Sequence, residues 1–225
     1  MTTEYLVGLT YADRLRLVTE ARHLGLRQLF TSELLSLTSL MGPMSEGPEW
    51  PAGAAWLAAR HGLDACIISD GLSDPWVERD RPETGLGLEV FMQSPDTGVS
   101  EVSPLKQLAD TWLFPMVAEI SHSLANYVRL SERLLAGELV SMEFNIDHLK
   151  DGRGRVGVLL QTPQWPNYQI QIANSHVALF AATLLTPAEL KFLRGKGETG
   201  RQELARLLQS AGIGHVSHVR RASVV

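Results

Sequence analysis

Two hydrophobic patterns alternate along this chain, one with the spacing of an amphipathic helix and one with the spacing of a strand. Residues 12–40 have apolar side chains at helical spacing, and Gly25 is expected to divide them into two short helices. Residues 42–51 are rich in glycine and proline, which predicts a loop, and a short helix over residues 52–60 is expected to follow. The charged residues of the first helical segment are predicted to face solvent: Asp13, Arg14, Arg16, Glu20 and Arg22.

The middle of the chain predicts two strands and then the strongest helix candidate. Residues 65–69 have the composition of a buried strand. Residues 87–93 form a second strand with large side chains on both faces, which favours a central position in a sheet. Helical periodicity then extends over residues 112–135, with Pro115 in the first turn, where its missing N–H is not needed. Gly137 lies where a C-terminal glycine cap is expected.

The last third of the chain returns to strands and ends with helices. Strands are predicted over residues 139–146 and 156–161, and the Asp-Gly pair between them favours a hairpin turn. Residues 177–185 are apolar enough for a central strand. The sequence Thr-Pro-Ala-Glu at 186–189 is a capping box that should start a helix. The remaining expected elements are helices over residues 187–193 and 201–210 and an edge strand over residues 216–219.

This order of elements is not a regular alternation of strand and helix. It therefore favours an α/β (α+β) fold, with a mixed, largely antiparallel β-sheet flanked by helices, over a doubly wound parallel sheet. The glycine- and proline-rich loop is the place where an internal boundary is expected. The sequence thus predicts a helical N-terminal segment, residues 1–48, followed by the main domain, residues 49–225.

Composition narrows the class of protein. The chain has 225 residues, 44% of them hydrophobic, which is enough for a substantial core. A net charge of −5 without a run of lysine or arginine argues against nucleic-acid binding. The single cysteine, Cys66, cannot form a disulfide within the chain and is expected to be a small buried side chain. No signal sequence or membrane span is predicted, so the expected location is cytoplasmic.

Several pairs of residues resemble parts of active sites but lack the rest of the pattern. The glycines at 195–200 do not have the spacing of a phosphate-binding loop. Glu119 and His122 lie three apart on the long helix in one copy, whereas di-iron bundles use two. His215 and His218 would point to opposite faces of a strand, and Asp147-His148 reads as a turn. No catalytic residue, cofactor or metal site is therefore expected; an enzyme that combines the acidic loop described next with His122 or His148 is the weakest alternative.

Acidic residues gather in and around the loop between the first two predicted strands: Asp70, Asp74, Glu78, Asp80 and Glu83. Three interpretations are open, namely a metal site, a surface for a basic partner segment, and an ordinary solvated loop. Pro75 and Pro82 interrupt the segment, which disfavours a compact metal site. Trp76, in a polar loop flanked by proline, is either a lid on the core or an anchor at an interface.

Four motifs in one order resemble the suppressor of fused-like family. They are Asp-Gly-Leu-Ser-Asp at 70–74, Gly-Leu-Gly-Leu-Glu-Val-Phe at 85–91, Trp-Leu-Phe-Pro at 112–115 with Leu-Ala-Asn-Tyr-Val at 124–128, and the apolar strand 177–185 followed by Thr-Pro-Ala-Glu-Leu. The resemblance covers most of the chain from Leu63. It does not include the first 60 residues or residues 161–175, and the loop after Asp74 is shorter than in animal members.

The resemblance implies a mixed α/β fold, no catalytic residues and a role in binding another protein. Animal members hold an extended peptide of a transcription factor, whereas single-domain bacterial members include immunity proteins that neutralise toxins. The extra C-terminal domain of the animal proteins is not seen here, so the bacterial role is expected, with a peptide-binding adaptor as the alternative. Trp76 matches the family's peptide-contacting aromatic residue and Asp80 its acid. The residues expected to bind a partner are therefore Asp74, Trp76, Glu78 and Asp80.

Overall fold

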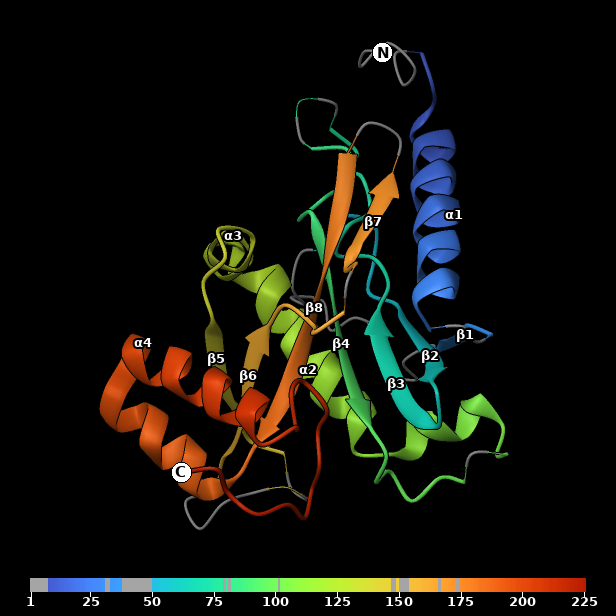
Figure 1. Cartoon of the computed structure of the whole chain (residues 1–225). Helices are drawn as coiled ribbons and strands as arrows, with labels where there is room; N and C mark the ends of the chain where they lie inside the picture. The colour runs from blue at the N-terminus through green and yellow to red at the C-terminus, as the bar shows by residue number, and fades with distance from the viewer. Residues whose placement is uncertain are drawn as a thin grey trace.

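A single eight-stranded sheet organises the computed structural model of this chain (Figure 1). The structure describes residues 8–30, 33–37, 50–78, 80, 82–100, 102–146, 149, 154–165, 167–172 and 175–225. The strands are β1 (Leu35–Leu37), β2 (Trp56–His61), β3 (Asp64–Ser69), β4 (Leu88–Ser94), β5 (Val140–Phe144), β6 (Val156–Gln161), β7 (Gln169–Ile172) and β8 (Ser175–Leu185). Their order is β1-β2-β3-β4-β8-β6-β5, and β7 pairs with the first part of β8. The described strand pairs are antiparallel except β4 with β8.

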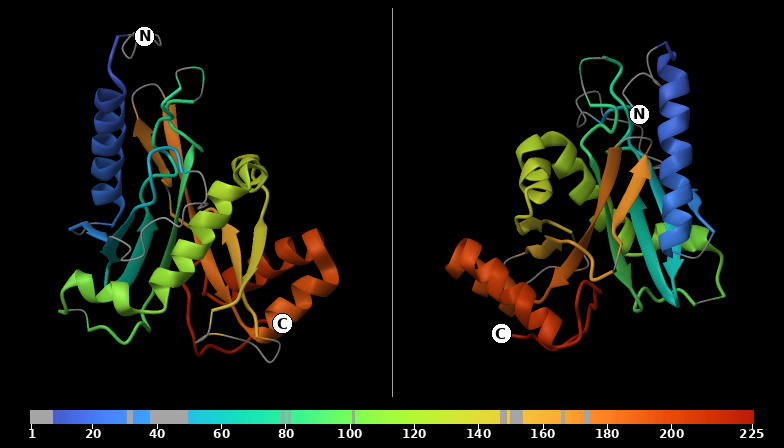
Figure 2. Two further views of the ribbon diagram at one scale, coloured as in Figure 1. Left: turned by 180° about the vertical axis from the view of Figure 1, so that it is seen from behind. Right: turned by 45° about the horizontal axis from the view of Figure 1, so that its top comes forward.

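Helices cover both faces of this sheet, as the two further views show (Figure 2). Helix α1 (Tyr11–Phe30) lies over β2 and β7, whereas α2 (Leu113–Asn126) packs on the opposite face against β3 and β4. The remaining helices are the 3-10 helix η2 (Leu105–Asp110), α3 (Val128–Leu135) and α4 (Pro187–Ser210). Helix α4 packs against β6 and β8. The fold is therefore the mixed, mainly antiparallel sheet with flanking helices that the sequence predicts.

Strand β8 contributes to three hydrophobic cores. Phe180 and Leu184 point into the core shared with α2, whereas Leu179 and Ala181 belong to the core under α1. Leu185 packs with α4. Because side chains alternate along a strand, an apolar strand of this length must be covered on both sides. The expected central position of this strand, and of β4, is confirmed.

Local capping signals are also confirmed. Thr186 accepts a hydrogen bond from the Glu189 amide, and the Glu189 carboxylate accepts one from the Thr186 amide. The two helices expected after this capping box both lie in α4, which is kinked at Gly197, where φ is 58°. The long helix predicted over residues 112–135 is instead interrupted at Tyr127, between α2 and α3. Gly137, with a φ of 85°, ends α3 as expected.

Four predicted elements are wrong. The helical pattern over residues 12–40 does not continue to its end, because α1 ends at Phe30 and Leu35–Leu37 form β1, which pairs with β2. Gly25 does not break α1, which continues to Phe30. The glycine lets the helix pack closely against Ile170 of β7, where a larger residue would clash. Residues 52–60 do not form a helix, because β2 pairs with β1 and β3 and is buried on both faces. Residues 216–219 form no strand within the described part of the chain, although the Ser217 amide bonds to the Gln93 carbonyl.

Two further expectations are only partly covered by the structure. The hairpin of β5 and β6 is confirmed by its register, but most of its Asp-Gly turn lies outside the described residues. The boundary near residue 48 also lies outside them and stays a prediction. Helix α1, from the N-terminal side of that boundary, packs directly on the sheet through β2 and β7.

Candidate partner-binding site

The loop between β3 and β4, residues 70–87, contains the first family motif and the start of the second, and we call it the β3–β4 loop. Its first half is organised by Glu89, whose side chain is fully buried on β4. The Glu89 carboxylate accepts hydrogen bonds from the amides of Gly71 and Ser73 at 3.1 and 3.0 Å. It also accepts from the hydroxyls of Ser69 and Ser73 at 2.5 and 2.6 Å. The motif is therefore a backbone turn wrapped around one buried carboxylate.

Arg22 of α1 completes this buried cluster. Its side chain is 1% exposed, and its guanidinium lies 2.7 Å from a carboxylate oxygen of both Asp70 and Asp74. It also donates to the Ser73 hydroxyl at 3.1 Å and lies 3.7 Å from Glu89. Helix α1 is thus joined to the β3–β4 loop by buried ion pairs. A buried charge needs such partners because they replace the water that it loses.

The carboxylates of this cluster respond differently to their surroundings. Burial raises the pKa of Glu89 to about 7, although the Arg22 charge and the two serine hydroxyls act in the opposite direction. Burial also raises the pKa of Asp74 against the effect of Arg22. For Asp70 the balance reverses: burial is opposed by His23, whose Nε2 lies 2.8 Å away, and by Arg22, and the pKa falls below its usual value. His23 and the buried arginine together therefore outweigh burial at Asp70, whereas burial prevails over the same arginine at Asp74 and Glu89.

The four residues expected to contact a partner fall into two groups. Asp74 and Trp76 lie inside: Asp74 is paired with Arg22, and Trp76 is 8% exposed and part of the core shared with α2. Glu78 and Asp80 are exposed, as is Val77 at 60%. Of the two roles open for Trp76, the structure places it as a lid on the core. Contact with a partner stays a prediction, and Val77, Glu78 and Asp80, which we call the tip, are its accessible part.

The charge of the tip is more balanced than its acidic residues alone indicate. Arg79 and Arg81 alternate with Glu78 and Asp80 in the sequence, although both arginines lie outside the described residues. Glu83, the next acid, is paired with Arg14 of α1 at 2.8 Å. A purely basic partner is therefore not required by the charges of this loop.

Sequence reasoning missed Arg14, Arg22 and Glu89 as parts of this site. The two arginines were assigned to solvent, but the buried positions of α1 recur every four residues: Arg14, Val18, Arg22, Leu26 and Phe30. That spacing is the signal in the sequence that both arginines lie on the buried face of the helix. The signal is weak because apolar residues also lie off this stripe, such as Leu24, which is 58% exposed, and because arginine is rarely buried without partners.

The other candidate histidines, His122 and His215, have their hydrogen-bond partners outside this cluster. Burial lowers the pKa of His122, which accepts a hydrogen bond from the Trp50 indole, and burial lowers that of His215 to about 4. Burial raises the pKa of the Cys66 thiol, consistent with its expected role as a buried side chain. Asp147 and His148 lie outside the described residues. Among the residues that are described, no group of histidine, cysteine or acidic side chains could hold a metal ion.

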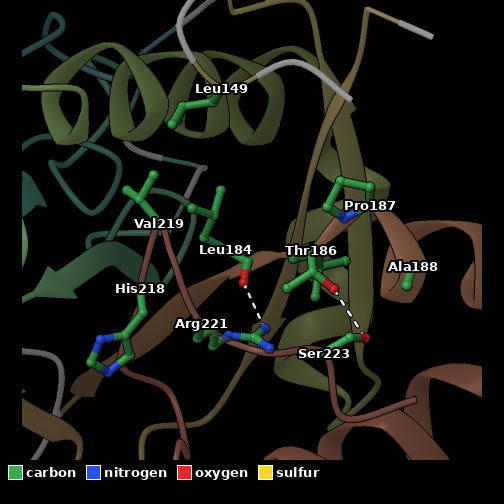
Figure 3. A pocket seen from close by; sticks show the side chains of 10 residues that line it. Leu149, Leu184, Thr186, Pro187, Ala188, His218, Val219, Arg221 and Ser223 are labelled. Carbon is green, nitrogen blue, oxygen red and sulfur yellow. Dashed lines mark hydrogen bonds between the residues drawn. The ribbon is translucent and has the colours of Figure 1, made fainter. Parts of the chain in front are cut away.

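A cavity of about 510 Å³ lies far from the β3–β4 loop, between the start of α4 and the C-terminal tail (Figure 3). Arg221 is its main polar group. Its guanidinium is paired with both oxygens of Glu189 and donates to the Leu184 carbonyl at 3.1 Å. Thr186 and Ser223 bond to each other across the same region. These contacts tie the tail to the helix start.

Comparison with known proteins identifies the fold of this chain. No family model and no curated protein matches the sequence. Among solved structures, a chain of the Sufu-Fu complex is similar over 92% of both chains, with 18% identity and a TM-score of 0.51. The crystal structure of Drosophila Suppressor of Fused is similar over 72% of this chain and 39% of that chain, with 15% identity and a TM-score of 0.45.

The first of these similarities confirms that the chain has a suppressor of fused-like fold, as the sequence motifs predict. The motifs also acquire a physical meaning. Residues 70–74 form the turn around Glu89, and Gly85 and Gly87 occupy left-handed conformations, with φ of 52° and 73°, where the chain enters β4. Of the helices that the structure describes, none is both long and apolar enough to cross a membrane.

Proposed function

We propose that this chain is a non-catalytic protein-binding module that sequesters a partner protein, in the manner of a bacterial immunity protein that neutralises a toxin. The observation that carries the proposal is the arrangement of the β3–β4 loop. Its base is fixed by the buried cluster of Arg22, Asp74 and Glu89, while the tip is exposed. Binding loops on a rigid base are typical of protein recognition, because a fixed loop loses little conformational entropy on association.

The comparisons support a role in protein binding by analogy. The similar solved chain was crystallised in a complex, that of Sufu with Fu. The family resemblance of the sequence adds the immunity role of single-domain bacterial members. Fold similarity at this identity leaves the identity of the partner open to experiment.

A peptide-binding adaptor unrelated to toxins is the second candidate. The observation that favours it is the position of β5, the last strand in the order of the described sheet. An extended peptide could add to such an edge through main-chain hydrogen bonds. Under this alternative, a short peptide would bind and a folded toxin would not.

The product of the gene next to that of this chain is the first partner to test. We expect cells that express a toxic neighbour to survive only when this protein is co-expressed, and we expect the two purified proteins to bind in calorimetry. Equal killing with and without this protein would exclude the immunity role for that neighbour. Binding of a short extended segment alone would favour the adaptor.

Charge variants then test the surface. The double variant Glu78→Gln/Asp80→Asn should weaken binding about tenfold, since each exposed interfacial charge contributes up to about 1 kcal/mol. Glu198→Gln, an exposed acid on α4, is the matched control and should bind like the unmodified protein. An unchanged affinity in the double variant would show that the partner binds elsewhere.

A further inference from the structure

Arg14, in the first turn of α1, contacts both ends of the exposed part of the β3–β4 loop. Its Nη2 donates to the carbonyl oxygens of Trp76 and Val77, each at 3.2 Å, and its Nη1 donates to the Glu83 carboxylate at 2.8 Å. The Arg14 side chain is 2% exposed. One guanidinium therefore connects the residues that lead into the tip with the residue that follows it.

The two flanks of the loop have anchors of their own. The first flank is bound to Glu89, and the Leu86 amide on the second flank donates to the Leu72 carbonyl at 2.8 Å. A turn from Pro82 to Gly85 shapes the return of the chain. Arg14 adds three hydrogen bonds from α1 to the stretch between these flanks.

We infer that Arg14 is a positioning residue that closes the β3–β4 loop, because it holds Trp76 and Val77 at one end of the exposed stretch and Glu83 at the other. A guanidinium suits this task because its donors lie in one plane at fixed angles and can reach three acceptors together. The consequence for partner binding rests on the proposed function. The closure itself does not, and it can be measured in the free protein.

A lysine at position 14 would reproduce only part of these contacts. Its ammonium is a compact charge on a flexible stem, so it could pair with Glu83 but would not reproduce the planar contacts with two carbonyls. Arg14→Lys should therefore restore part of the closure that Arg14→Met removes. A site that needed only positive charge would be restored fully.

Hydrogen exchange of the free protein, followed by mass spectrometry, tests the closure. Arg14→Met should speed exchange about tenfold in peptides over residues 75–86, the loss expected for hydrogen bonds to a charged group, while β3 and β4 exchange as before. Arg14→Lys should be intermediate. Arg16→Met, an exposed position on the same helix, is the control and should leave the loop unchanged. Unchanged loop exchange, or an equal rise throughout α1 and the sheet, would overturn the inference.

Affinity for the neighbouring gene product separates this inference from the proposed function. Arg14→Met should weaken binding about tenfold by lowering the fraction of molecules with a closed loop. If Glu78→Gln/Asp80→Asn weakens binding and Arg14→Met does not, the positioning role in binding is wrong and the proposed surface stands. If neither variant affects binding while Arg14→Met still frees the loop, the proposed surface is wrong and the closure stands.

Discussion

Replacing Arg22 by methionine tests whether buried charge docks α1 on the β3–β4 loop. Methionine keeps an unbranched apolar side chain in the same place but removes the guanidinium. The variant therefore loses the contacts at 2.7 Å to Asp70 and to Asp74 and the bond at 3.1 Å to Ser73. Asp70 and Asp74 remain nearly buried, and Glu89 remains fully buried, without the cation that compensates them.

The expected loss of stability is large. Removing one member of a buried ion pair typically costs about 3–5 kcal/mol, because a charge is left unpaired in the interior. Domains are usually stable by about 5–15 kcal/mol, so the variant should lose a large share of its free energy of unfolding. At about 2–4 °C per kcal/mol for a chain of this size, the melting temperature should fall by about 6–20 °C.

Urea unfolding followed by circular dichroism would measure this loss. The matched control is Arg16→Met on the exposed face of the same helix, whose ion pair with Glu20 is solvated and should contribute less than about 1 kcal/mol. Adding Asp74→Asn to Arg22→Met removes one of the uncompensated charges and should recover part of the stability. A loss below about 1 kcal/mol for Arg22→Met, or no difference from the control, would refute docking by buried charge.

Three further predictions concern the interior. Trp76→Ala should cost about 3–5 kcal/mol because the ring is part of the core, whereas Val77→Ala should change the unfolding free energy by less than about 0.5 kcal/mol; equal effects would contradict the burial of Trp76. Burial raises the pKa of Glu89 from an ordinary 4.5 to about 7. Between these two pH values the native state binds more protons than the unfolded state. The free energy of unfolding should therefore fall as pH rises through this window, by at most about 3 kcal/mol. Glu89→Gln should flatten this part of the curve of urea midpoint against pH, and an unchanged slope would assign it to other groups. Arg221→Met leaves the buried Glu189 without its cation and should cost about 3 kcal/mol in urea unfolding, whereas an unchanged midpoint would show that this pair is not stabilising.

The parts of the fold that sequence predicts well are those set by local patterns. The capping box at Thr186 depends only on residues within one helical turn. The strands β3 and β8 contain apolar runs that are too long for a strand at the surface of the sheet. The alanines of residues 52–60 predict a helix, but they fit strand β2 equally well. Its pairing with β1 and β3 decides the outcome, and that information is distant in sequence.

The candidate site could be predicted only in outline. The β3–β4 loop was found from its motifs and acidic residues, but the helix that holds it was not, since the acceptors of Arg22 lie about 50 residues away along the chain. A buried arginine cannot be distinguished from a solvated one until its partners are known. The spacing of four residues between Arg14, Val18 and Arg22 indicates a buried face only when the carboxylates of the loop are known to lie beside it.

The first two family motifs, residues 70–74 and 85–91, are almost entirely buried, whereas Tyr127 and Val128 of the third motif are exposed. The Ser73 hydroxyl donates to Glu89, and Glu89 also accepts from two backbone amides. Asp70 accepts from Arg22. Substituting Asp70, Ser73 or Glu89 should therefore change stability and the position of α1, whereas substituting the tip should change partner affinity with little effect on unfolding. The resemblance therefore informs about the fold, and under the proposed function the partner is recognised by the exposed residues that the base supports.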